Sequence, residues 1–150
     1  MQRSLINQKP LVTFLYIFTY VIYESLSSIY LFLPPMFAVL FVLYSQAIEK
    51  KDFLLLSILA FCLIVYETNQ GYLLFSSIIY FTLIHNFVLP KIKKSFNCNF
   101  CIKIFDVLIA YIGYYLFLLI LANIFLLETP NISYYIVYYI VIELFIVGLL

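Results

Sequence analysis

The stretch IEKKDFLLLSILAFCLIVYETNQG, residues 48–71, places an apolar run between a basic turn and a polar turn. Lys50 and Lys51 precede the run, and Glu67 to Gly71 follow it. Because Lys and Arg accumulate in the cytoplasmic loops of membrane proteins, this order predicts a helix that leaves the cytoplasm just after Lys51. Apolar runs between basic and polar turns recur along the rest of the chain.

All eight basic residues lie in three clusters that occupy every second gap between apolar runs. This spacing predicts an all-α, polytopic membrane protein of about six transmembrane helices with both termini cytoplasmic. Pro34 and Pro35 are expected to end the first apolar run and Pro90 the fourth helix. The basic clusters are Arg3 with Lys9, Lys50 with Lys51, and Lys91, Lys93 and Lys94 with Lys103; the expected helices cover residues 11–24, 35–48, 53–66, 72–89, 104–127 and 133–150, with outer turns at 67–71 and 128–131 and an inner loop at 91–103.

Composition points the same way. The chain is 67% hydrophobic and 10% charged, and its mean hydropathy is +1.14. These values lie outside the range of soluble domains, so we expect one transmembrane helical domain over residues 1–150. The net charge of +1 gives no footprint for nucleic acid, which we exclude as a partner.

Acids within apolar runs are the candidate functional residues, because a charge near the bilayer centre costs about 3 kcal/mol or more unless paired or hydrated. Glu24 follows Lys9 by fifteen residues, and Glu67 follows Lys51 by sixteen. The helical rise places both acids roughly 22 to 24 Å above the inner surface. Two interpretations stay open: the acids line an outward-facing pocket or anchor a partner's helix, or each marks a hydrated helix end.

Glu143 lies inside the last apolar run, with Tyr135 and Tyr139 two turns and one turn before it on one helical face. A tyrosine hydroxyl one turn away is placed to donate to the carboxylate. Two interpretations stay open for this acid. It makes a buried polar contact with a neighbouring helix or partner, or it reaches toward the inner surface or stays protonated.

Tyrosines gather in two groups that suit interfacial aromatic belts. Ala110 and Gly113 form the best site for close contact between helices. The tyrosine groups are Tyr111, Tyr114 and Tyr115 in the fifth expected helix, and Tyr134, Tyr135, Tyr138 and Tyr139 at the start of the sixth.

Cysteine and histidine offer little chemistry. Cys98 and Cys101 form a C-x-x-C in the inner loop, Cys62 lies in the third expected helix, and His85 is the single histidine. A structural zinc site usually needs four ligands, so we expect reduced thiols, no metal and no cofactor. No phosphate-binding or nucleophile motif occurs, and we expect a protein that is not an enzyme.

A characteristic order of residues extends from the second to the fourth expected helix. Pro35 begins an apolar run that ends at Leu43 and Tyr44, a charged inner turn follows, and the next helix closes on Glu67 before a turn with Gly71 and the sequence Ser-Ile-Ile-Tyr at residues 77–80. This order resembles the MreD family of bacterial rod shape-determining membrane proteins, in which the acid is typically Asp.

The resemblance implies a non-enzymatic scaffold of the cell-elongation machinery in the bacterial inner membrane, supporting peptidoglycan synthesis and rod shape. Its implied partners are MreC, the MreB filament, a penicillin-binding transpeptidase and a RodA-type glycosyltransferase, besides membrane lipid. Glu24, Glu67, Gly71, Glu143 and Tyr139 are the candidate contacts with a partner or pocket. Two other classes stay open: the membrane-embedded substrate-binding subunit of a vitamin-type transporter, and a membrane enzyme acting on a lipid or quinone.

Overall fold

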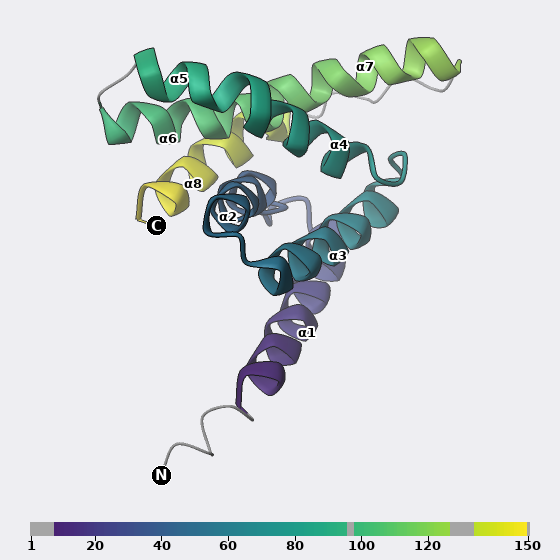
Figure 1. Cartoon of the computed structure of the whole chain (residues 1–150). Coiled ribbons are helices and arrows are strands. Elements are labelled where there is room, and N and C mark those ends of the chain that lie inside the picture. Colours follow the sequence, from purple (N-terminus) through teal and green to yellow (C-terminus); the bar gives the residue numbers. More distant parts are fainter. Residues whose placement is uncertain (1–7, 96–97, 127–133, 150) are drawn as a thin grey trace.

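The computed structural model describes residues 8–95, 98–126 and 134–149, and over these residues the chain is helical without strands (Figure 1). The predicted all-α class is therefore confirmed. The elements are α1 (Gln8–Ile29), α2 (Phe37–Lys50), α3 (Phe53–Gln70), α4 (Ser76–Leu83), the π-helical segment η1 (Ile84–Val88), α5 (Leu89–Ser95), α6 (Asn99–Leu108), the π-helical segment η2 (Ile109–Gly113), α7 (Tyr114–Phe125) and α8 (Tyr135–Leu149).

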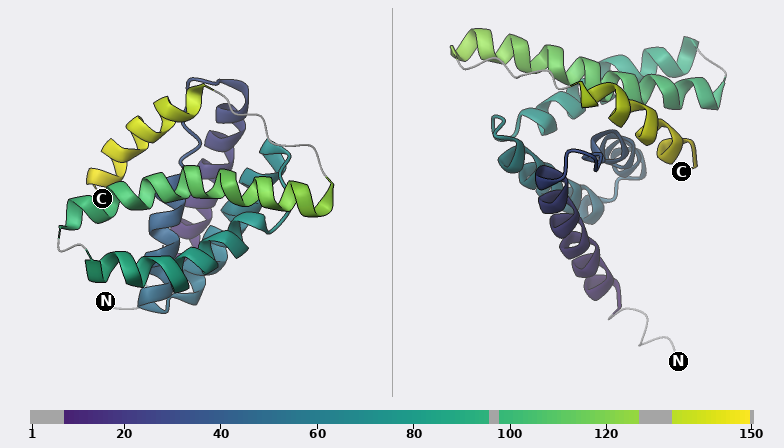
Figure 2. Two further views of the ribbon diagram at one scale, coloured as in Figure 1. Left: turned by 90° about the horizontal axis from the view of Figure 1, so that it is seen from above. Right: turned by 180° about the vertical axis from the view of Figure 1, so that it is seen from behind.

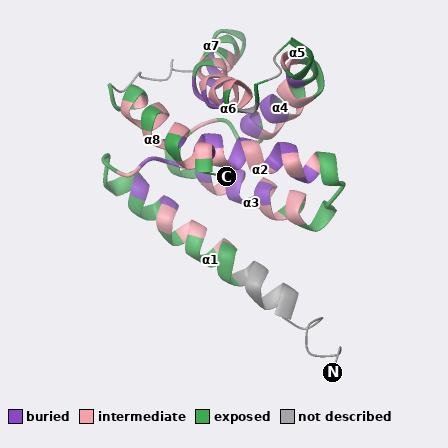
Figure 3. Cartoon of the chain, turned by 90° about the vertical axis from the view of Figure 1, so that its left-hand side faces the viewer, coloured by how far each residue is buried: buried purple, intermediate pink, exposed green. Residues whose placement is uncertain are grey.

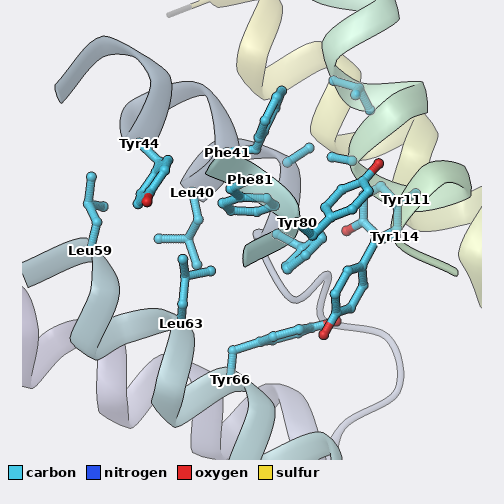
Figure 4. Close-up of a cluster of buried hydrophobic side chains, with 14 of the residues drawn as sticks. Leu40, Phe41, Tyr44, Leu59, Leu63, Tyr66, Tyr80, Phe81, Tyr111 and Tyr114 are labelled. Carbon is cyan, nitrogen blue, oxygen red and sulfur yellow. The ribbon is translucent and has the colours of Figure 1, made fainter. Parts of the chain in front are cut away.

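Helix α2 is the centre of the fold and contacts α3, α4, α6, η2 and α8. Helices α1 and α3 run along one side of it, and the α4–α5 and α6–α7 rods lie on the other (Figures 1 and 2). Phe37 is fully buried in the core around this helix, and so are Phe41, Phe81 and Leu63, which Figure 4 labels. Burial of these side chains orders the helices around α2.

The outer surface of the bundle is apolar. Phe53–Gln70 and Phe100–Phe125 are long and apolar enough to cross a membrane, and Tyr135–Leu149 is a shorter apolar helix. Only 28% and 22% of the residues in the apolar windows of the two longer helices are buried, and the others keep part or most of their surface exposed (Figure 3). A core helix of a soluble protein would bury most of that surface.

Two helices run further than the sequence predicts. α1 was expected to stop at Glu24 but continues to Ile29, because the serines that follow Glu24 bond to helix or loop carbonyls and do not end the helix. α3 was expected to stop at residue 66 but continues through Glu67 to Gln70. It ends at Gly71, whose φ of 71° lies in the left-handed region that glycine adopts without strain.

Pro90 does not end the fourth helix, contrary to the prediction. The helix starts at Ser76 and runs through Pro90 to Ser95. The proline follows the π-helical turn η1, in which the Leu89 N–H donates to the Ile84 carbonyl. Asn86, whose carbonyl a proline ring would meet in a regular helix, lies within this wider turn, so the chain stays helical across the proline.

The predicted inner loop at residues 91–103 is mostly helical. α5 reaches Ser95 and α6 begins at Asn99, with Cys98 as its N-cap. The fifth helix therefore starts earlier than residue 104 and continues through η2 to Phe125. The predicted outer turn at residues 128–131 lies outside the described residues.

Candidate functional site

Glu143 of α8 caps the first turn of α2. Its side chain is fully buried, and its two carboxylate oxygens accept hydrogen bonds from the Phe37 N–H at 3.1 Å and the Ala38 N–H at 2.7 Å. The Tyr111 hydroxyl donates to the same carboxylate. The acid thus contacts a neighbouring helix, as one of the two interpretations of the sequence proposed.

Local sequence explains why α2 needs this distant cap. Pro34 and Pro35 direct the chain into the helix, and Met36 then adopts a φ of 57° without any side-chain cap of its own. The N–H groups of a first helical turn have no partner within the helix, and the helix dipole favours a negative charge beside them. A glutamate from α8 satisfies both requirements.

Glu67 of α3 caps the start of α4 in the same way. It is fully buried at the end of α3, and its oxygens accept the Phe75 N–H and the Ser77 N–H, each at 2.6 Å. The hydroxyls of Ser76 and Ser77 add bonds of 3.2 and 2.5 Å. The predicted hydrated helix end is therefore wrong for Glu67, because this carboxylate lies inside the bundle.

Glu24 is buried in α1 but is poorly satisfied. Tyr20 donates to one oxygen at the long distance of 3.4 Å, and the other oxygen has no hydrogen-bond partner among the described residues. A hydrated helix end is wrong for this residue as well. Glu24 and Glu67 are both absent from the walls of the cavity described next.

A partly open cavity of about 190 Å³ lies where the ends of α1 and α3, the starts of α2 and α8, and the middle of the α6–α7 rod meet. Its walls are rich in tyrosine, and Figure 4 shows three of these side chains, Tyr66, Tyr111 and Tyr114, in the buried cluster. Phe37 lines the cavity, stacks on the Tyr66 ring at a centroid distance of 4.8 Å and contacts the Tyr114 ring in a tilted arrangement at 4.7 Å. The polar lining residues are Ser27, Ser28, Gln70, Tyr66, Tyr72, Tyr111, Tyr114, Tyr115 and Tyr139.

Tyr111 and Tyr114 do not belong to an interfacial belt, contrary to the prediction, whereas Tyr115 beside them is half-buried. Tyr111 and Tyr114 are 9% and 4% exposed because α2 and α4 cover them. Tyr139 lines the cavity and donates its hydroxyl to the Leu31 carbonyl at 2.6 Å, and not to Glu143 one turn away. Sequence spacing identified Glu143 but assigned it the wrong tyrosine, since the partner comes from another helix.

Gly113 is a site of close helix contact, as predicted. The Tyr80 hydroxyl donates to the Ile109 carbonyl at 2.6 Å and passes directly over the glycine. A Cβ atom on Gly113 would lie 2.0 Å from that hydroxyl oxygen. Ala110 beside it is fully buried.

Exposed charges and thiols lie at the end of α2, on α5 and at the start of α6. Lys93 pairs with Glu49, and the Lys103 amino group donates to the Gly148 carbonyl at 3.3 Å. The described residues hold no group of three or more His, Cys, Asp or Glu side chains arranged for a metal ion. Hydrogen bonds from the Cys101 thiol and backbone N–H hold the pKa of the exposed Cys98 thiol below its ordinary value.

Comparisons with known proteins add no relative: no family model matches the chain, and neither characterised proteins nor solved structures give a significant match. The resemblance to the MreD family therefore stays a prediction.

Proposed function

We propose that this chain is a multi-pass protein of the bacterial inner membrane and a non-enzymatic scaffold of the cell-elongation machinery. The observation that carries the proposal is the distribution of polarity. Glu24, Glu67 and Glu143 are fully buried, whereas large apolar side chains are exposed on α1, α3 and α8 and on the α4–α5 and α6–α7 rods that surround α2. A lipid environment favours this arrangement, because it solvates apolar surface and leaves polar groups to be satisfied inside.

The proposed topology has six spans with both termini in the cytoplasm. The two helices that are long and apolar enough to cross a membrane support it, as do the lysines at the α2–α3 turn and around the α5–α6 turn. In this topology the tyrosine-lined cavity opens toward the outer surface, and the Lys93–Glu49 pair lies at the inner surface. Labelling with an impermeant thiol reagent tests it: Cys98 should react from the cytoplasmic side, and a cysteine placed at Asn131 should react from outside.

The scaffold role is supported by what the buried acids do. Glu67 and Glu143 bind helix ends through hydrogen bonds that hold α4 and α2 in place. Their chemistry therefore serves the shape of the bundle, and what the bundle presents to other molecules is its apolar helix faces. We expect those faces to bind the transmembrane helices of MreC, the transpeptidase or the RodA-type glycosyltransferase.

α1 is the face best placed for such a partner. It packs mainly on α3, and Tyr16, Phe18 and Ile22 stay exposed along it at 70%, 57% and 46%. Changing Phe18 and Ile22 together to Ala should reduce copurification of MreC or the transpeptidase. The matched control is Ile124→Ala, at an exposed position of α7.

Copurification from membranes is the decisive experiment. Recovery of MreC or a penicillin-binding transpeptidase, lost in the α1 variant and kept in the α7 control, supports the scaffold. A gene position among vitamin-uptake genes, or an ATPase module as the bound partner, would overturn it.

The cavity keeps a second function open, the substrate-binding subunit of a small-molecule transporter. Its polar lining of tyrosines and serines supplies the ligand contacts that this class of protein requires. At about 190 Å³ the cavity is smaller than the roughly 300–1,000 Å³ of drug-sized ligand sites, so it fits only a small ligand. Copurification with an ATPase module would favour this alternative.

A further inference from the structure

Several hydroxyl groups around the cavity donate their protons to protein acceptors. Tyr111 donates to Glu143, Tyr139 to the Leu31 carbonyl, and Ser27 to the Leu33 carbonyl. A hydroxyl whose proton is committed elsewhere offers its oxygen only as an acceptor. These three oxygens therefore act as acceptors and favour a ligand with donors.

Tyr66 adds a hydroxyl that is free to pair with a ligand. The residue is 5% exposed, lines the cavity, and its hydroxyl has no hydrogen-bond partner among the described residues. The hydroxyl oxygen is not among the fully buried unpaired atoms, so it is accessible from the cavity and free to pair with a molecule bound there.

The surrounding charge favours a cation. No Lys, Arg or His lines the cavity, while Glu143 lies directly behind Tyr111 and Glu67 lies behind Tyr114 through the Ser76 hydroxyl. Tyrosine ring faces also carry negative charge density and attract ammonium groups within about 6 Å of the ring centre. Acceptor oxygens, ring faces and nearby carboxylates therefore all favour a cationic ligand.

We propose that this tyrosine-lined cavity is a binding site for a small alkylammonium group, such as ethanolammonium. Its N–H donors pair with the Tyr66 hydroxyl and the committed hydroxyl oxygens, and its alkyl carbons lie against Phe37 and Leu118. Either a free amine or the ethanolamine head of a phospholipid supplies this chemistry. The inference goes beyond the scaffold role and does not depend on it, because the site lies entirely within this chain.

The test uses the purified full-length chain in a neutral detergent and calorimetric titration with three probes of similar size: ethanolammonium, neutral ethylene glycol and anionic glycolate. We expect ethanolammonium alone to bind, in roughly the high-micromolar to millimolar range for a ligand of so few atoms. In a second arm, the chain is placed in nanodiscs of mixed phosphatidylethanolamine and phosphatidylglycerol, and the lipid retained on release is identified by native mass spectrometry.

The decisive variant is Tyr66→Phe, which removes the unpaired hydroxyl and keeps the ring. Because that hydroxyl makes no bond within the described residues, the variant should fold normally and bind about tenfold or more weakly, as expected for one lost hydrogen bond to a charged group. The matched control, Tyr16→Phe at an exposed position of α1, should bind like the wild type.

Binding of free ethanolammonium that weakens in Tyr66→Phe supports a site for a soluble amine. Retention of phosphatidylethanolamine without binding of the free amine, again reduced by the variant, supports a lipid headgroup site. The proposal is overturned if neither probe binds, if ethylene glycol binds equally well, or if Tyr66→Phe binds like the wild type. Failure of MreC to copurify would leave all of these outcomes unchanged.

Discussion

Replacing Glu143 tests whether a distant carboxylate holds the central helix in place. Glu143→Leu keeps an apolar side chain of similar size but removes the acceptor of the Phe37 and Ala38 N–H groups, which are both buried. Each buried donor left unpaired costs about 1–3 kcal/mol, so the two together should destabilise the fold by about 2–6 kcal/mol. Against a typical stability of about 5–15 kcal/mol this is a large fraction.

Glu143→Gln separates hydrogen bonding from charge. The amide keeps one acceptor oxygen, so one of the two N–H groups stays paired while the other faces an NH₂ group. We expect a loss of about 1–3 kcal/mol, intermediate between the wild type and Glu143→Leu.

The assay is unfolding of the purified protein by titration with a denaturing detergent, followed by far-ultraviolet circular dichroism of its helices. The matched control is Glu49→Gln, which breaks an exposed ion pair with Lys93 and should cost at most about 1 kcal/mol. If Glu143→Leu unfolds within about 0.5 kcal/mol of the wild type, the cap does not stabilise α2 and the reasoning is refuted.

Three further predictions follow from other contacts. Glu67→Leu should destabilise the chain by about 2–6 kcal/mol in the same unfolding assay, because two buried N–H groups at the start of α4 lose their acceptor; an effect no larger than that of the Glu49 control would contradict this. Gly113→Ala should cost about 1–3 kcal/mol, since its Cβ displaces the Tyr80 hydroxyl from the Ile109 carbonyl. That penalty should shrink in a Tyr80→Phe background, and an equal penalty in both backgrounds would show that the close contact is not its cause. The lowered pKa of Cys98 predicts that its alkylation by iodoacetamide rises at a lower pH than for an ordinary thiol, because the thiolate is the reacting form. Cys101→Ala removes the thiol donor and should shift this pH profile upward, and an unchanged profile would argue against that hydrogen bond.

The sequence by itself determined the helical class, the apolar exterior and most helix positions. Apolar runs bounded by lysine clusters and by Pro34 and Pro35 place α2 within two residues of its observed bounds. Gly71 ends α3 in a left-handed conformation that glycine adopts without strain. Such features are local, so a single sequence carries them.

Only the tertiary structure decided what the acids and tyrosines do. Glu143 bonds to residues more than a hundred positions away, and Tyr111 reaches it from a third helix. Uniform hydropathy along these helices hides which face turns inward, because nearly every face is apolar. The distance between two residues along one helix follows from the sequence, whereas the partner of a buried carboxylate depends on how separate helices meet.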